Sequence, residues 1–481
     1  MNDIVFQPAR ELAGLLRTRQ LSATELVSAF IAQVERLNPK LNAIVTFVPE
    51  QALEQAKRID ARRDAPTLLS GLPIAYKDML PTKGIRTTYG SPIFADNVPA
   101  EDAVIVQRLR EAGAITLGKT NTPEFAAGSQ TFNKVFGATR NPWDLDKTCG
   151  GSSGGAAVAV ACGMLPFADG SDLGGSLRNP GNFNNVVGLR PTPGRVANYP
   201  SVDAWGTMSV IGPIARSVDD CAFLLSAMAG RDDRSPITLE APGAAFAAPL
   251  ERDFRGVRVA WWPYDGDRLR GDDAIPVDRR VIEALSRQRR VFESLGCIVE
   301  DAHPDLRGAD EAFQVLRALG FVQRYAGLLA KHRDQIKDTV VWNIEQGLAM
   351  DLPRVARAMN LRSEVFRRMR EFMQRYDFLC MPVNQVPPFP LSQPYVDEIN
   401  GAKLASYIEW MKTCYYITAT SHPAISVPGG FTDDDPPLPV GLQIVGRYRG
   451  DFEVLQMAHA FERETRFTER RPPILQTASG G

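Results

Sequence analysis

Residues 149–176 read CGGSSGGAAVAVACGMLPFADGSDLGGS, and this stretch decides what kind of protein the chain forms. Two loops rich in glycine and serine, 149–155 and 170–176, enclose a run of small apolar residues typical of buried helix and strand. The stretch belongs to a longer segment, Asn121 to Arg195, that is far richer in Gly, Ser, Asn and Pro than its flanks. Because loops on a rigid scaffold carry binding and catalytic groups, we expect the chemistry to lie here.

The flanks of this segment alternate amphipathic helices with short apolar strands. Upstream, a capping box from Ser22 to Glu25 opens a helix that extends to about Asn38. The further elements that we expect are strands at 41–47, 71–78, 114–117, 258–262, 297–300, 377–383, 424–430 and 439–446, and helices at 49–63, 102–113, 277–296, 309–330, 353–376, 404–419 and 451–464. This alternation predicts an α/β architecture with a mixed or parallel sheet buried on both faces.

Composition argues against several classes of function. The 481 residues are 44% apolar and include 55 basic and 56 acidic residues, so we expect a large core and no nucleic-acid partner. Four scattered histidines and six cysteines without CxxC spacing give no basis for a metal site, and we expect neither metal nor cofactor. No segment reaches 18 consecutive apolar residues and the N-terminus lacks a signal-peptide pattern, so we expect a soluble cytoplasmic protein without membrane contact.

Two motif matches are disfavoured by their context. Residues 113–120, GAITLGKT, satisfy the P-loop pattern, but AITL is itself the best local strand candidate and Pro123 follows where a helix should be under way. Residues 151–155, GSSGG, satisfy the nucleophile-elbow pattern with Ser153 as nucleophile. That elbow needs an apolar strand before it and a histidine partner, and the chain offers neither in a recognisable place.

A serine activated by lysine is the interpretation that the remaining residues favour. Glycines directly before Ser176 let successive backbone N–H groups converge on one point, as an oxyanion hole requires. Lys77 ends the apolar strand GLPIAYK, so burial would disfavour its charged form and make it a base, while Asp78 points to the opposite face. Glycine and serine also fill ordinary turns, and a lysine at a strand end is commonly solvated, so the residues alone leave the nucleophile open.

A series of ordered segments resembles the amidase signature family over nearly the whole chain. The matching segments are GLPIAYKD, EAGAITLGKTNTPEF, FGATRNPWD, GGSSGGAAVAVACG, ADGSDLGGSLRNPG, VVGLRPTPGRV, IGPIARSVDD, HPAISVPGGF and LPVGLQIVG. The resemblance implies that Ser176 is the nucleophile, that Ser152 follows a cis peptide and relays the proton, and that Lys77 is the base.

The resemblance also assigns supporting roles. The oxyanion would be held by the backbone N–H groups of Leu173, Gly174, Gly175 and Ser176. We expect Ser153 and Ser171 to hydrogen-bond the relay, and Asp172 and Arg178 to brace the loop.

The family builds a single α/β/α domain around one large mixed sheet, so we expect one domain over 1–481 with the catalytic core at about 70–215. The implied activity is hydrolysis of a small amide, or also of an ester or carbamate, through an acyl-enzyme. Two alternatives stay open, the glutaminase subunit of a tRNA-dependent amidotransferase and a non-catalytic scaffold. The resemblance favours a homodimer without fixing the oligomeric state.

The substrate pocket is expected to draw on the variable segments 128–132, 199–210, 309–350 and 407–411. Their aromatic and aliphatic content predicts an apolar or aryl substrate. The pocket residues that we select from these segments are Gly128, Ser129, Gln130, Trp205 and Trp410.

Overall fold

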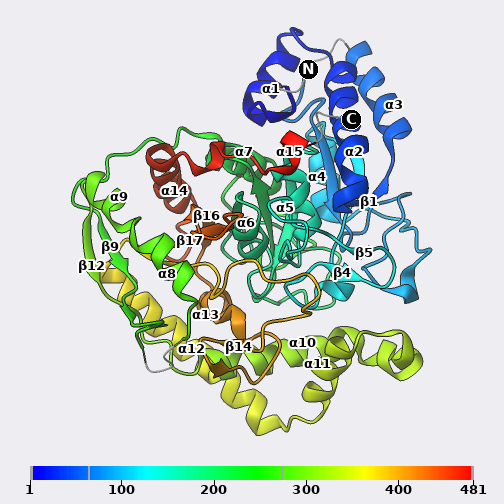
Figure 1. The fold of residues 1–481 in the computed structure, drawn as a ribbon. Coiled ribbons are helices and arrows are strands. Elements are labelled where there is room, and N and C mark those ends of the chain that lie inside the picture. Colours follow the sequence, from blue (N-terminus) through cyan, green and yellow to red (C-terminus); the bar gives the residue numbers. More distant parts are fainter. Residues whose placement is uncertain (1–3, 63–64, 272–274, 478–481) are drawn as a thin grey trace.

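A mixed sheet of eight strands forms the centre of the computed structural model, which describes residues 4–62, 65–271 and 275–477 (Figure 1). In spatial order the strands are β12 (Ile298–Asp301), β9 (Arg258–Trp261), β13 (Phe378–Pro382), β17 (Pro439–Gly446), β16 (Ala424–Phe431), β7 (Val187–Arg190), β8 (Val210–Ala215) and β6 (Phe167–Asp172). The first three are mutually parallel, and every later neighbour pairs antiparallel. The expected large mixed sheet is therefore confirmed.

A smaller sheet continues the edge at β6. It consists of β1 (Ile44–Phe47), β3 (Ile115–Thr120) and β2 (Pro73–Lys77), with β3 in the middle. Strand β2 lies beside β6, and the backbone N–H of Lys77 donates to the carboxylate of Asp169 on β6 at 3.2 Å. This junction between the sheets places the end of β2 next to the second glycine-serine loop.

Helices cover both faces of the large sheet. Side chains alternate along a strand, so Gly441 and Gln443 of β17 share one face while Gly446 lies on the other. The first face carries α6 (Arg178–Phe183), whose Arg178 donates to Gln443 Oε1 at 2.6 Å. The second carries α14 (Asp451–Thr465), because a Cβ on Gly446 would meet Val454 at 2.3 Å. The arrangement is the α/β/α sandwich that the resemblance implies.

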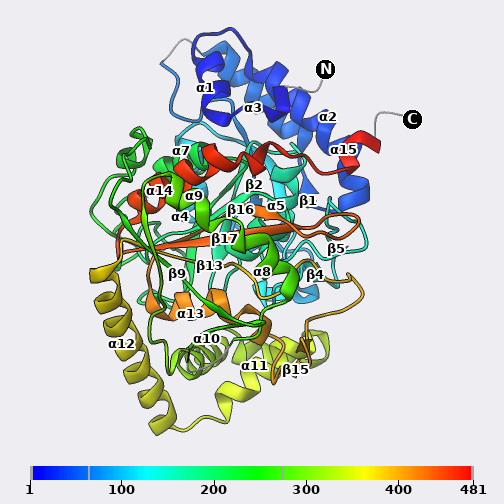
Figure 2. The ribbon, with the colours of Figure 1, turned by 60° about the vertical axis from the view of Figure 1, so that its left-hand side comes forward.

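Figures 1 and 2 both place α10 and α11 at the end of the molecule opposite α1–α3. The remaining helices are α1 (Ala9–Arg17), α2 (Ala23–Leu41), α3 (Pro49–Ala61), α4 (Val104–Glu111), α5 (Gly154–Ala161), α7 (Val218–Met228), α8 (Arg279–Ser286), α9 (Arg289–Ser294), α10 (Ala309–His332), α11 (Asp338–Leu348), α12 (Leu352–Arg375), α13 (Lys412–Thr420) and α15 (Ile474–Thr477). Short hairpins are β4 (Phe132–Asn133) with β5 (Gly137–Ala138), β10 (Tyr264–Asp265) with β11 (Arg268–Leu269), and β14 (Glu398–Ile399) with β15 (Ala402–Lys403).

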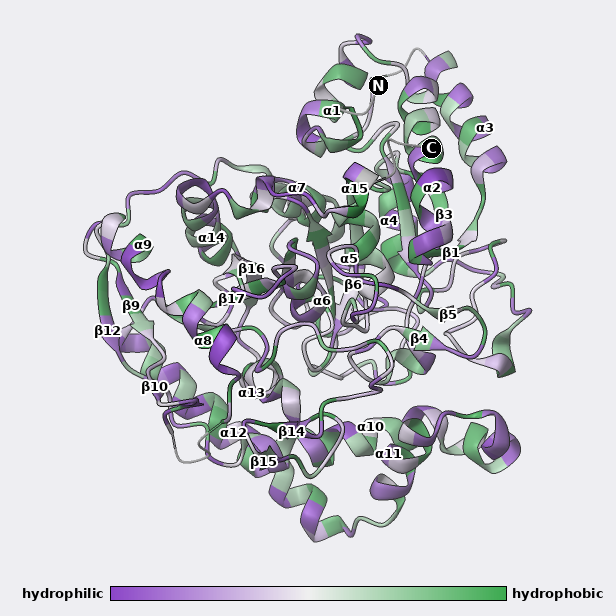
Figure 3. Ribbon diagram, viewed as in Figure 1, coloured by the Kyte–Doolittle hydropathy of each residue, from purple (hydrophilic) through white to green (hydrophobic). Residues whose placement is uncertain are grey.

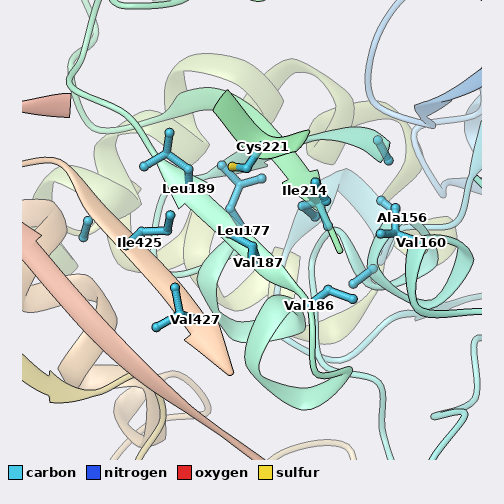
Figure 4. Packing of buried hydrophobic residues seen from close by; sticks show 14 of the residues in the cluster. Ala156, Val160, Leu177, Val186, Val187, Leu189, Ile214, Cys221, Ile425 and Val427 are labelled. Atoms are coloured by element: carbon cyan, nitrogen blue, oxygen red, sulfur yellow. The ribbon is translucent and has the colours of Figure 1, made fainter. Parts of the chain in front are cut away.

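The main core lies between the sheet and these helices. Figure 4 shows Val187 and Leu189 of β7 beside Ile425 and Val427 of β16, with Ala156 and Val160 of α5 nearby. In Figure 3 the surface helices α2 and α3 mix hydrophilic with hydrophobic residues, as expected for helices with one buried stripe. The sheet and its covering helices therefore form the packed frame from which the loops extend.

Most expected elements are present, with two corrections. The helix expected over 277–296 is interrupted between α8 and α9, because the side-chain amide of Gln288 donates to the carbonyl of Ala284 at 3.3 Å while its own N–H turns to Leu285. The helix expected over 404–419 begins only at Lys412. The capping box from Ser22 to Glu25 is confirmed; Arg63, the end of the helix expected over 49–63, lies outside the described residues.

Candidate active site

Lys77 sits at the end of a strand whose five residues are all buried. Its ammonium donates to the hydroxyl of Ser152 at 2.7 Å, and to those of Ser153 and Ser171 at 3.0 Å each. Burial lowers the pKa of Lys77 from 10.5 to about 7, and the carboxylates of Asp169 and Asp172 oppose this only in part. A lysine with this pKa has a substantial neutral fraction at neutral pH and can accept a proton.

The first glycine-serine loop delivers Ser152 and Ser153 to Lys77 from the start of α5. The peptide between Gly151 and Ser152 is cis, and the N–H of Gly151 is held by the Asn179 side chain at 2.9 Å. A Cβ on Gly155 would lie 2.4 Å from the backbone nitrogen of Asn121, so only glycine lets α5 approach β3 this closely. The glycines here serve packing as well as turn geometry.

The second loop presents Ser176 to the same place. Ser176 is 8% exposed, and its backbone carbonyl accepts a hydrogen bond from the Ser153 N–H at 3.2 Å. The N–H of Gly175 is taken by the Asp172 carboxylate at 2.9 Å. The N–H groups of Leu173, Gly174 and Ser176 have no acceptor within the described residues. Of the four expected oxyanion donors, Gly175 is thus engaged elsewhere and three remain available.

Asp172 and Arg178 anchor this loop to the core. Arg178 makes two hydrogen bonds to the Asp172 carboxylate, at 2.9 and 3.0 Å, and Arg190 lies 3.3 Å from it. All three side chains are fully buried. Burial alone would raise the pKa of Asp172, yet the two guanidinium groups hold it well below its ordinary value. These contacts tie the two side chains to one another inside the core, and the bracing role of this pair stays a prediction.

Three buried charged residues near Lys77 were not selected from the sequence. Asp169 accepts the Lys77 N–H, and burial raises its pKa to about 6. Lys119 donates to Leu80 O and Thr82 Oγ1, and burial lowers its pKa to about 8. Asp78 accepts from the Thr88 hydroxyl at 2.5 Å. Asp169 lies in the motif segment ADGSD, and Lys119 lies in the segment GKT. The sequence therefore points to both segments but not to the contacts that these two side chains make.

A cavity of about 650 Å³ opens beside these groups, within the range of pockets for small molecules. The floor of the cavity is lined by Lys77, Ser152, Asp169, Ser171 and Ser176. Its walls are largely aromatic and aliphatic, being formed by Tyr89, Phe94, Phe125, Leu173, Tyr199, Val202, Ile211, Phe321, Tyr325 and Leu328. Ser153 does not line it, although it contacts Lys77.

The structure places the selected pocket residues away from the main cavity, although two of the expected segments line it. A separate hollow of about 20 Å³ is lined by Gly128, Ser129, Gln130 and Trp410. Trp410 is 1% exposed, with one face parallel to Phe183 at 6.2 Å, and therefore belongs to the core. Trp205 is 74% exposed and lines none of the hollows identified. The 199–202 loop and α10 do line the main cavity, but through other side chains.

The described residues also bear on metal binding and on membrane contact. Across 4–62, 65–271 and 275–477, no cluster of three or more histidine, cysteine, aspartate or glutamate side chains is arranged to hold a metal ion. Within the same ranges, no helix is both long and apolar enough to cross a membrane.

The fold and this site define an amidohydrolase. Comparison with known proteins gives the family: a family model described as Amidase matches residues 25–455, so the chain belongs to the amidase signature family. It is 36% identical to a glutamyl-tRNA(Gln) amidotransferase subunit of Moorella thermoacetica, covering 98% of this chain and 99% of that protein. It is 35% identical to an acylamidase of Rhodococcus erythropolis, covering 96% of each.

Solved structures agree with this assignment. A bacterial aryl acylamidase of the amidase signature family superposes with a TM-score of 0.88 at 28% identity and covers 99% of both chains. The family and the fold expected from the sequence are therefore confirmed.

Proposed function

We propose that this protein is an amidase that acts through a relay from Ser176 through Ser152 to Lys77. The observation that carries the proposal is the buried Lys77 ammonium, which contacts Ser152 at 2.7 Å and has a pKa lowered to about 7, at the floor of the cavity that Ser176 also lines. Neutral Lys77 takes the proton of Ser152, and Ser152 takes that of Ser176. The Ser176 oxygen then attacks the carbonyl carbon of the substrate.

The supporting groups act on charge as it develops. The N–H groups of Leu173, Gly174 and Ser176 receive the oxyanion of the tetrahedral intermediate, a contribution of about 3–4 kcal/mol for one such donor in a well-formed site. Collapse of the intermediate passes a proton back through the relay to the leaving amine and leaves an acyl group on Ser176. Water then releases the acid. Ser153 and Ser171 keep the Lys77 amine pointed at Ser152.

The walls of the cavity support an apolar or aryl substrate. The aromatic side chains form a connected group, with Phe125 stacked on Tyr325 at 4.4 Å and Tyr89 edge-on to Phe94 at 5.2 Å. Such walls favour flat, apolar groups through burial and ring contacts. Anilides, and the corresponding esters and carbamates, are the substrates that we propose.

The test is hydrolysis of a panel of anilides, aliphatic amides, esters and carbamates by the wild type, Ser176→Ala and Lys77→Ala. Both variants are expected to lose at least about 10³-fold in kcat/KM. A serine-directed fluorophosphonate followed by peptide mass spectrometry identifies the nucleophile, with Ser176 expected to carry the label. A label on Ser153, or full activity of Ser176→Ala, would contradict the relay.

A second candidate function is that of a glutaminase working inside an amidotransferase complex. It is favoured by the 36% identity, over nearly the full length of both chains, to one component of a glutamyl-tRNA(Gln) amidotransferase. Activity measurements on the isolated chain distinguish the two functions. A stand-alone amidase hydrolyses anilides as an isolated chain, whereas a glutaminase of such a complex prefers glutamine and gains activity with partner proteins that co-purify from its native host.

A further inference from the structure

Arg324 on α10 is a cation in the wall of the main cavity. Its Nε atom is buried without a hydrogen-bond partner. Neither a carboxylate nor a carbonyl group of the described residues pairs with its guanidinium. A buried donor without a partner costs free energy, and an arginine keeps its charge at every physiological pH. The side chain therefore has unused capacity to bind an anion.

The surroundings hold this guanidinium in place without neutralising it. The Cζ atom of Arg324 lies 6.0 Å from the ring centre of Phe321 and 5.9 Å from the ring centre of Tyr325. One turn back on α10, a Cβ on Gly320 would approach the Nη2 atom of Arg324 to 2.9 Å. The absence of a side chain at Gly320 thus gives the guanidinium room to lie along the helix.

The nearby ionisable groups are already engaged. Arg317, the other arginine in the cavity wall, donates to Asn343 Oδ1 and to the Tyr407 hydroxyl. The carboxylate of Glu124 accepts from the Ser91 hydroxyl at 2.6 Å and from the Lys337 N–H at 2.7 Å. Asp169 is bound to the Lys77 N–H. Arg324 is left as the cation that a ligand can pair with.

We propose that Arg324 binds a carboxylate of the substrate, so that the amides turned over by this protein carry a carboxylate on an aromatic group. The planar fork of a guanidinium matches a carboxylate with two parallel hydrogen bonds. The aromatic walls accept the ring, and the arginine orients it. This inference rests on the proposed function, since it names the substrate class of the same cavity.

The first experiment compares kcat/KM for pairs of anilides that differ only in a carboxylate or a methyl group. The pairs carry the substituent either on the amine side, as acetamidobenzoates, or on the acyl side, as monoanilides of benzenedicarboxylic acids. In at least one pair the wild type is expected to prefer the carboxylate by about 10- to 100-fold, the usual effect of a charged hydrogen bond. Arg324→Gln abolishes the preference and Arg324→Lys retains part of it.

Two further variants sharpen the comparison. Gly320→Ala keeps the charge but displaces the guanidinium, so the preference falls without the loss of an arginine. Arg370→Gln removes an exposed arginine of α12 and keeps the wild-type preference. Using a ratio of two substrates cancels any shared loss of catalytic power.

A binding measurement separates this inference from the proposed function. Calorimetry on Ser176→Ala, with the carboxylate and methyl anilides as ligands, is expected to show tighter binding of the carboxylate that Arg324→Gln in the same background removes. If the wild type failed to hydrolyse the anilides while Ser176→Ala still bound the carboxylate anilide more tightly, only the proposed amidase function would be overturned. Equal binding of both ligands, or a preference that survives Arg324→Gln, would overturn the role of Arg324. Stronger selection of glutamine than of every acetamidobenzoate would overturn the aromatic carboxylate as the substrate class.

Discussion

At the scale of single residues, the role proposed for Lys77 as the base predicts how activity depends on pH. Burial holds the pKa of Lys77 at about 7, well below 10.5, so the amine gains a proton as the pH falls through neutrality. A protonated amine cannot accept the proton of Ser152. With a neutral anilide as substrate, kcat/KM is expected to fall about 10-fold per pH unit below pH 7 and to level off above it. A rate that stays flat to pH 5 would exclude Lys77 as the base.

Asp172 illustrates a different residue-scale effect, because its partners are buried charges. In Asp172→Asn, the guanidinium groups of Arg178 and Arg190 lose their only buried carboxylate partner within the described residues. We expect a loss of about 3–5 kcal/mol in the free energy of unfolding, measured by urea denaturation, together with loss of activity.

The matched control for this change is Asp253→Asn. Asp253 pairs with Arg255 at 2.6 Å on the surface, where both side chains are more than half exposed. Exposed ion pairs contribute little to the free energy of unfolding, so Asp253→Asn is expected to unfold at the same urea midpoint as the wild type. Equal effects of the two substitutions would show that the Asp172 cluster does not brace the loop.

Individual residues also show what could be predicted from the sequence. Local sequence motifs contain Lys77, Ser152 and Ser176. The structure brings Lys77 and Ser152 into contact. Asp169 could not be selected, because its role depends on β2 lying beside β6, a contact across 92 residues of chain. A large aromatic residue such as Trp410 suits a cavity wall and a core equally well, so the sequence does not show that it belongs to the core.

At the scale of elements, the loop before Ser176 depends on a backbone that only glycine adopts easily. Gly175 has φ of 114°, and a Cβ there would lie 2.7 Å from the Cβ of Cys414 on α13. Gly175→Ala is therefore expected to shift the loop and lower kcat/KM by at least about 10²-fold, since small displacements of reacting groups have effects of this size. Steady-state kinetics on the folded variant provides the measurement.

Gly14→Ala is the control for this substitution. Gly14 lies inside α1, with no atom within 4 Å of the position a Cβ would occupy. Alanine is the better helix former, so the variant is expected to be more stable by about 0.5–1 kcal/mol, with wild-type kinetics. If Gly175→Ala also kept wild-type kinetics, the geometry of the loop would not matter for catalysis.

Elements with a strong periodic pattern were predictable, and those shaped by distant contacts were not. Helices α10 and α12 and strands β16 and β17 appear within a few residues of the expected positions. The break between α8 and α9 follows from one side-chain hydrogen bond of Gln288, which no periodicity reveals. The start of α13 at Lys412 coincides with a bond from its N–H to Gln385, 27 positions earlier.

At the scale of the whole molecule, the buried apolar residues among those that the structure describes form two separate clusters. The large cluster surrounds the central sheet. A smaller one joins α10 and α11 to the segment around Phe125, and it includes or contacts six residues of the cavity wall: Tyr89, Phe94, Phe125, Phe321, Tyr325 and Leu328. The sheet thus supports the two glycine-serine loops, while the small cluster supports part of the cavity wall. Sequence patterns identify apolar faces but not which faces meet, so this division emerged only from the structure.

The two clusters predict different consequences for the same substitution. Ile344 of α11 and Ile425 of β16 are both fully buried, the first in the small cluster and the second in the large one. Ile425→Ala is expected to lower the free energy of unfolding by about 2–5 kcal/mol while KM for anilides stays at the wild-type value in the folded protein. Ile344→Ala loosens the wall behind Phe321, so KM rises about 10-fold or more.

Stability and kinetics measured side by side test this division. For Ile344→Ala, we expect the backbone amides of α10 and α11 to exchange hydrogen faster, while those of β7 and β16 stay protected. The reason is that a small separate cluster can open locally. If Ile344→Ala and Ile425→Ala raised KM equally, or if both lowered protection across the central sheet to the same extent, the two clusters would behave as one core. The substrate surface would then depend on the stability of the sheet.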